Sequence, residues 1–179
     1  IPGDAPLTLF VNHLKSKLAL GKTQAQKDAD TVQSHAIRRR QAETVAKLVS
    51  QRMSGRTTTA LYAVVGDFND TPTSPSLTPL TRHALLTDVL ATHLPLLERY
   101  TYFWRGRNRV SQIDYILASK ALARRIAGRV GKNSKQTPHI ERAGLGFVPG
   151  SGANAHTIRN PSFTAFEPDA RFAKDADGK

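Results

Sequence analysis

The chain lacks cysteine and has few acidic residues. With no cysteine among its 179 residues, it can form neither disulfides nor thiolate metal sites, and its redox compartment is left undecided. Any bound metal must be held by carboxylate, amide, imidazole or water ligands. Such ligands suit hard cations such as Mg²⁺ or Mn²⁺.

Long apolar runs are also missing. No stretch reaches the roughly 18 apolar residues that a membrane-spanning helix needs, so we expect no membrane span. No signal peptide is visible, and the chain begins with Ile1 rather than Met, so we expect a processed product or a fragment. Hydrophobic residues make up 39% of the chain, which predicts a modest or incomplete core.

Basic residues are abundant and clustered. Lys and Arg number 26 against 14 Asp and Glu, a formal net charge of +12 with a pI near 10.5. Such an excess favours a polyanionic partner, most often nucleic acid, over a generally basic surface. Between residues 105 and 135 the only acid is Asp114, and the nine basic residues are Arg105, Arg107, Arg109, Lys120, Arg124, Arg125, Arg129, Lys132 and Lys135.

Apolar runs rich in β-formers predict several strands. The run at 58–66 is continuously apolar, which indicates burial on both faces, and we also interpret the run at 6–13 as a buried strand. The connection GRNR, between the runs at 100–106 and 111–119, indicates a hairpin. The predicted strands are 6–13, 58–66, 100–106 and 111–119.

A helix is predicted at 31–53, ended by Ser54 and Gly55. Its apolar stripe is formed by Ile37, Val45, Leu48, Val49 and Met53. Arg38 also lies within this stripe, and we interpret the arginine triplet 38–40 as a mostly solvated face. A short helix with a break near Pro95 is predicted at 85–97, and a short basic helix or turn at 120–128.

A strand, a helix and a second strand in this order predict a layered α/β fold. We expect one domain over residues 1–167, irregular from about residue 129, with a last short strand at 162–166. A mobile tail is expected at 168–179.

Polar groups stand at or in three of the predicted strands. His13 ends the first, Asp67 and Asn69 follow the second, and Asp114 lies in the fourth. Strand ends converge on one rim of an α/β sheet, the usual place for a ligand site. Taken singly, each group also has a purely structural explanation, such as turn capping or an ion pair.

Together these segments resemble the C-terminal half of the endonuclease/exonuclease/phosphatase family. The carrying segments are FVNHLKSK (10–17), RRRQAETVAKLV (38–49), VVGDFND (64–70) and SQIDYILAS (111–119). The resemblance implies part of a four-layer α/β/β/α sandwich, incomplete in this chain. Because the HLKSK form is most similar to bacterial, often secreted members, a secreted or periplasmic location is expected.

The resemblance also implies roles for the strand-end residues. His13 would contact the phosphate or the departing oxygen, and Asp67 would orient or deprotonate the attacking water and touch the metal. Asn69 would hydrogen-bond the phosphate and hold Asp67, and Asp114 would orient a second histidine. If the backbone stays extended, Asp67 and Asn69 point the same way while Phe68 packs on the opposite side.

Further residues are expected at the substrate. They are Lys15, Lys17, Trp104 and Arg105, although Trp104 is equally consistent with core packing. Asp70 is interpreted as a cap of the following turn, and Gln112 as a weaker candidate for the same rim.

Two family features are missing. The family's N-terminal half supplies the Asn and Glu that hold the divalent metal, and nothing in this chain matches them, so we expect the main ligands of Mg²⁺ or Mn²⁺ outside it. No Ser-Asp-His motif occurs either. His156 in ANAHTIRNP (153–161) is the candidate replacement.

We therefore expect a metal-dependent phosphodiesterase, in first place a nuclease with little sequence preference. The alternatives are an inactive basic nucleic-acid-binding fragment, and a phosphatase or sphingomyelinase of the same family. The missing N-terminal half is an expected partner, because half a sandwich leaves strand edges and one sheet face uncovered.

Overall fold

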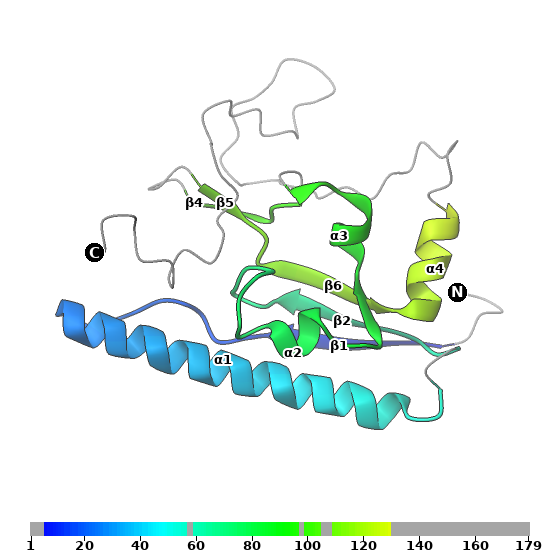
Figure 1. Ribbon diagram of the computed structural model, residues 1–179, viewed down its shortest axis with the longest axis horizontal. Helices are drawn as coiled ribbons and strands as arrows, with labels where there is room; N and C mark the ends of the chain where they lie inside the picture. The colour runs from blue at the N-terminus through cyan, green and yellow to red at the C-terminus, as the bar shows by residue number, and fades with distance from the viewer. Residues whose placement is uncertain (1–5, 57–58, 97–98, 105–108, 130–179) are drawn as a thin grey trace, which may run out of the picture.

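The computed structural model describes residues 6–56, 59–96, 99–104 and 109–129. Its centre is a four-stranded sheet in the order β1 (Leu7–His13), β2 (Leu61–Asp67), β6 (Asp114–Ser119) and β3 (Leu86–Asp88) (Figure 1). β1 and β2 are parallel, whereas β6 is antiparallel to both β2 and β3. The predicted α/β class is confirmed.

Helix α1 (Gln24–Met53) makes the crossover between the two parallel strands and lies along the sheet. It begins seven residues before the predicted start. The reason is a capping box, in which Thr23 accepts a hydrogen bond from the Gln26 amide while the Gln26 side chain accepts one from Thr23. Its end at Met53, before Ser54 and Gly55, is as predicted.

The core fills the space between α1 and one face of the sheet. Side chains of β1, β2 and β6 that alternate toward this face meet the buried stripe of α1. The Phe68 ring stacks on Tyr115, with ring centroids 4.8 Å apart. The buried cluster comprises Leu14, Ala42, Ala46, Val49, Met53, Tyr62, Val64, Phe68, Leu77, Leu80, Tyr115 and Leu117.

The buried stripe of α1 includes an arginine. Arg38 is fully buried, whereas Leu48 of the predicted stripe is exposed. Treating the arginine triplet as a solvated face is therefore wrong for Arg38. Arg39 does face solvent, where it pairs with Glu43.

The opposite face of the sheet is exposed along β1 but buried at its centre, where Leu61 and Ala63 of β2 and Ala118 of β6 lie. Its apolar side chains include Leu7, Leu9, Val11 and Ile116, all exposed, with Val11 at 76%. β1 pairs only with β2 within the described part of the chain. The prediction of a buried first strand is therefore wrong, because none of the described elements covers the face of β1 that carries Leu7, Leu9 and Val11.

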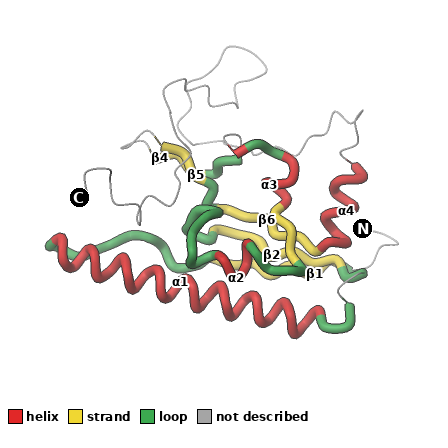
Figure 2. The backbone as a smooth tube through the Cα atoms, viewed as in Figure 1, coloured by secondary structure: helices red, strands yellow, loops and turns green. Residues whose placement is uncertain are grey.

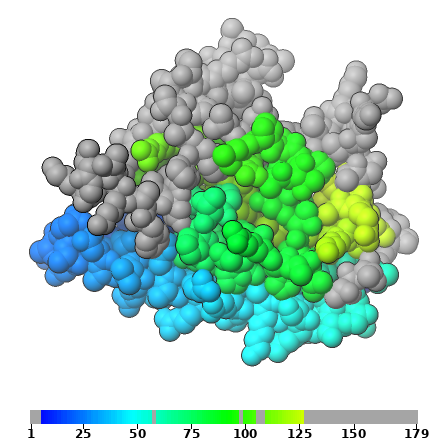
Figure 3. Space-filling model, viewed as in Figure 1, coloured from blue at the N-terminus to red at the C-terminus, as the bar shows by residue number. Residues whose placement is uncertain are grey.

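The remaining elements are short. They are α2 (Thr78–Thr81), α3 (Val89–His93), α4 (Lys120–Arg129), β4 (Tyr102–Trp104) and β5 (Arg109–Ser111). α4 matches its prediction, and α3 is a shorter form of the helix predicted at 85–97. The strand β3 and helix α2 were not foreseen. Figure 3 shows α1 in blue to cyan along one flank, with the green segment around α2 packed on it.

The strand predicted at 111–119 is divided in two. Ser111 ends β5, which pairs with β4, and β6 starts at Asp114 in the main sheet. The hydroxyl of Thr101 accepts the backbone N–H groups of both Ile113 and Asp114, which holds the chain where it changes sheets.

Within the described ranges, no helix is both long and apolar enough to cross a membrane. The irregular region, the strand at 162–166 and the tail at 168–179 lie outside the described residues. The second sheet of the four-layer sandwich stays a prediction.

Candidate active site

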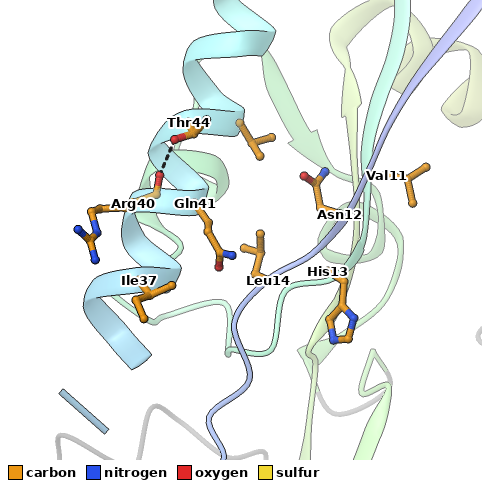
Figure 4. A pocket seen from close by; sticks show the side chains of 9 residues that line it. Val11, Asn12, His13, Leu14, Ile37, Arg40, Gln41 and Thr44 are labelled. Atoms are coloured by element: carbon orange, nitrogen blue, oxygen red, sulfur yellow. Dashed lines mark hydrogen bonds between the residues drawn. The ribbon is translucent and has the colours of Figure 1, made fainter. Parts of the chain in front are cut away.

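Three of the predicted site residues are neighbours in one row of the sheet. His13 of β1 pairs in register with Asp67 of β2, and Asp67 pairs with Asp114 of β6. Cross-strand partners project from the same face, which here is the face opposite α1. Figure 4 shows His13 and Val11 pointing away from α1, whereas Asn12 points toward it. The imidazole Nε2 of His13 lies 3.9 Å from Oδ2 of Asp67.

The chain turns sharply directly after Asp67. The Asp67 Oδ1 accepts the backbone N–H of Asn69 at 2.7 Å, and Asn69 has a left-handed φ of +54°. Asparagine tolerates this conformation better than most residues. The backbone is therefore not extended through Asn69, although Phe68 is buried as expected. Asn69 holds Asp67 through its backbone amide.

The turn is joined to the loop that follows β1. The Asn69 side-chain amide donates to the Leu14 carbonyl at 3.0 Å, and the Leu14 amide donates to the Asp67 carbonyl at 2.9 Å. The two loops leave neighbouring strands at the same end of the sheet (Figure 2). An amide nitrogen carries two hydrogens, so Asn69 retains a second N–H for a ligand.

The Asp67 carboxyl has a raised pKa. Burial is the largest cause, and the Asp114 carboxylate adds to it, while the Asn69 backbone N–H and His13 act in the opposite direction. A carboxylate with a raised pKa is a stronger base than an ordinary aspartate. This suits the predicted role of Asp67.

Asp70 has a role that the sequence did not reveal. Its carboxylate is fully buried and pairs with Lys17 at 2.6 Å and with Arg38 at 2.8 Å. Burial acts to raise the pKa of Asp70, but the two cations and hydrogen bonds from Lys17 and Ser74 hold it below the ordinary value. Its bond to the Thr71 amide does make the predicted turn cap, yet the ion pairs dominate. The presence of Arg38 in an apolar stripe was the available signal.

Lys17 and Lys15 differ in where their side chains lie. The Lys17 ammonium faces inward to Asp70, so the geometry gives it an internal partner and no support for its predicted contact with substrate. The Lys15 side chain is exposed, and its contact with substrate stays a prediction.

A groove of about 490 Å³ lies beside His13, between β1 and α1. Asn12 extends toward it from β1, and Gln41 lines it from α1 (Figure 4). Its wall also includes Arg40 and Thr44, whose hydroxyl donates to the Arg40 carbonyl.

Other predicted site residues lie further along the chain. Trp104 ends β4 and is partly buried. Gln112 is fully buried, and its side-chain amide donates to Asp88, so it does not sit on the rim. Arg105 and His156 lie outside the described residues, and their predicted roles are untested.

The family resemblance implies a divalent metal at this site. Asp67 and Asp114 present two carboxylates side by side, which are suitable donors for Mg²⁺ or Mn²⁺. Across residues 6–56, 59–96, 99–104 and 109–129, however, no three side chains of His, Cys, Asp or Glu form a metal-binding group. These residues alone do not make a complete metal site.

Comparison with models of protein families identifies a match. The model of the Endonuclease/Exonuclease/phosphatase family matches residues 13–134, which is more than half of the chain. The matched range begins at His13 and includes Asp67, Asn69 and Asp114. A search of curated proteins found no match.

Proposed function

Because the chain belongs to the endonuclease/exonuclease/phosphatase family, whose chemistry is the hydrolysis of phosphate esters, we propose that it is a phosphodiesterase acting on nucleic acid. The observation that carries the proposal is the single row formed by His13, Asp67 and Asp114. A phosphodiester bound on that row would face an imidazole and two carboxylates, with the Asn69 amide beside them.

In this proposal the chain's own residues share the acid–base work. Asp67 takes a proton from the attacking water, because its carboxylate lies in the row beside His13. Its orientation is fixed by the Asn69 backbone amide. His13, 3.9 Å from Asp67, donates a hydrogen bond to a phosphate oxygen or a proton to the leaving oxygen. The second N–H of Asn69 binds the phosphate without adding negative charge.

Members of the family generally depend on a divalent metal. Such an ion would neutralise charge on the phosphate. We propose that Asp67 is one ligand and that the main ligands come from polypeptide outside the described residues. The exposed side chains of β1 on the face that carries the site support this proposal, because a partner layer placed there would reach the same row. Secretion stays an expectation that rests on the resemblance alone.

A nucleic-acid substrate is supported by charge. The net charge of +12 favours a polyanion over a neutral lipid headgroup. A second candidate function, an inactive nucleic-acid-binding protein, is favoured by one specific observation. The described residues present two carboxylates but no group of three His, Cys, Asp or Glu side chains that could hold a metal.

A plasmid-nicking assay with Mg²⁺ tests the proposal. We compare the wild type with Asp67→Asn, which keeps an oxygen to accept the Asn69 amide, and with Asp28→Asn, a matched change at an exposed aspartate of α1. Nicking that is lost in Asp67→Asn and kept in Asp28→Asn supports hydrolysis at this site. Equal nicking by all three proteins contradicts it, and salt-sensitive binding without nicking supports the inactive alternative.

A further inference from the structure

Three charged residues form a buried cluster directly behind the active-site turn. Asp70 and Arg38 are fully buried, and the Lys17 side chain is only 12% exposed. The Lys17 Nζ binds Oδ1 of Asp70, and the Arg38 Nε binds Oδ2. We call Lys17, Arg38 and Asp70 the Asp70 cluster.

The cluster joins three separate segments. Lys17 comes from the loop after β1, Asp70 from the loop after β2, and Arg38 from the middle of α1. Arg38 also donates from Nη1 to the Lys15 carbonyl at 2.7 Å. One arginine of α1 therefore holds both loops.

Neighbouring bonds act on the same loops. The Lys15 amide donates to Oε1 of Gln41 on α1 at 2.8 Å, and the Tyr115 hydroxyl donates to the Asp70 carbonyl at 2.9 Å. Asp67 and Asn69 thus lie on a short turn that is anchored by hydrogen bonds or ion pairs at two places. One is the Leu14 backbone, which bonds to both residues, and the other is Asp70.

Stability alone is a poor explanation for such a cluster. Burying ions is costly, and well-packed apolar residues of similar volume often stabilise a protein as well or better. Charge-assisted hydrogen bonds, in contrast, are short and directional. They fix the position of the atoms that they join, and here those atoms belong to the two loops that carry the site.

We propose that Lys17, Arg38 and Asp70 are positioning residues for the phosphodiesterase site. They hold the turn of Asp67 and Asn69 against the loop after His13. The Asp67 carboxylate, the Asn69 amide and the His13 imidazole then point toward one phosphorus atom. This inference rests on the proposed function for its effect on rate. Its effect on the geometry of the turn is independent of activity.

The test uses two variants and a matched control. Lys17→Met removes one of the two cations and leaves Arg38 to pair with Asp70, so the fold is kept. Asp70→Asn removes the shared carboxylate. Arg39→Met is the control, since it removes a neighbouring arginine of the same helix whose ion pair with Glu43 is exposed.

Two readouts separate positioning from general stability. Hydrolysis of bis(4-nitrophenyl) phosphate with Mg²⁺ gives kcat and KM, and ¹H–¹⁵N NMR follows the backbone and side-chain amides of Asn69. In Lys17→Met we expect kcat to fall by about 10- to 100-fold with little change in KM, because catalytic groups misplaced by about 1 Å lose rate on this scale. The Asn69 amide signals should shift or broaden, and Arg39→Met should leave both readouts at wild-type values.

The outcomes distinguish the two proposals. If the wild type hydrolyses no phosphodiester, the proposed function fails, and the Asn69 signals alone judge the positioning role. If those signals are the same in wild type, Lys17→Met and Asp70→Asn, the positioning role is overturned, whatever the rates are. If Asp70→Asn does not fold, Lys17→Met decides the question by itself.

Discussion

The carbonyl oxygen of Asn12 lies only 1.9 Å from the place where residue 66 would carry a β-carbon. Residue 66 is glycine, with a φ of +127°, and this is why β1 can run so close to β2 directly before the site. Gly66→Ala should therefore destabilise the protein by more than about 2 kcal/mol, since both the backbone conformation and the contact oppose a side chain. Urea unfolding measures the change.

Gly55→Ala is the matched control for that prediction. Gly55 also has a positive φ, of +73°, but no atom within 4 Å would meet its β-carbon. Its substitution should cost only the conformational strain, about 1 kcal/mol. Equal losses in the two variants would mean that the contact with Asn12 is unimportant.

Asp67→Asn should gain stability while it loses activity. Because the pKa of Asp67 is raised in the folded protein, the folded state binds its proton more tightly than the unfolded state does. Ionisation at neutral pH therefore opposes folding. The facing groups are Asp114, which strengthens this effect, and His13, which weakens it.

The amide variant is expected to be more stable at pH 7 by about 0.5 kcal/mol. The difference should vanish as the pH falls below the ordinary aspartate pKa. Thermal unfolding from pH 3 to 8 measures it. An Asp67→Asn protein that is less stable than the wild type at pH 7 would contradict the prediction.

Asp70 should have the opposite dependence on pH. Its pKa is lowered on folding, so its ion pairs stabilise the protein above the unfolded pKa, about 3.9. That contribution is lost as the pH falls through the lower, folded value. The charged or titratable groups that face Asp70 are Lys17, Arg38 and His35, whose Nδ1 lies 4.0 Å from Oδ2.

Asp70→Asn should cost about 3–5 kcal/mol at pH 7, because it leaves two cations without their buried partner. The stability lost in Asp70→Asn should become smaller as the pH falls below the pKa that Asp70 has in the unfolded state. A constant difference between the variant and the wild type from pH 2.5 to 7 would exclude the carboxylate as the cause.

Asn69 can be tested for its backbone and its side chain separately. Asn69→Gly keeps the left-handed conformation and loses the bond to Leu14, whereas Asn69→Ala also introduces strain at a φ of +54°. Alanine should be less stable than glycine by about 1 kcal/mol. Both variants should be poor catalysts, since neither has an amide for the phosphate. A fully active Asn69→Gly would remove Asn69 from the mechanism.

Binding of nucleic acid should be strongly salt dependent. Each phosphate that a Lys or Arg neutralises adds roughly −0.9 to the slope of log K against log salt for duplex DNA. Fluorescence anisotropy with a labelled duplex should give a slope that corresponds to several phosphates. Affinity that is independent of salt would contradict the nucleic-acid assignment.

The sequence predicted which residues lie side by side better than it predicted their surroundings. His13, Asp67 and Asp114 stand at or in predicted strands, and the convergence of strand ends on one rim, with the family pattern, was enough to expect them together. The conformation at Asn69 was not predictable from alternation, because an aspartate side chain that binds a backbone amide two residues later bends the chain.

Burial was the less predictable part. Arg38 lies in the apolar stripe of α1 and Asp70 in the loop after β2, and only tertiary packing brings Lys17 to them from 53 positions before Asp70. β1 is apolar like a core strand, yet one of its faces is exposed. A local pattern shows that a face is apolar, but it does not show whether another layer covers it.

The bare side of β1 has a practical consequence for any measurement on this chain. Leu7, Leu9 and Val11 stand exposed on a strand with an unpaired edge among the described residues. An edge of this kind is a template for self-association. Specific activity should therefore decline as the protein concentration rises. Rates compared at nanomolar protein concentration will reflect catalysis and not self-association.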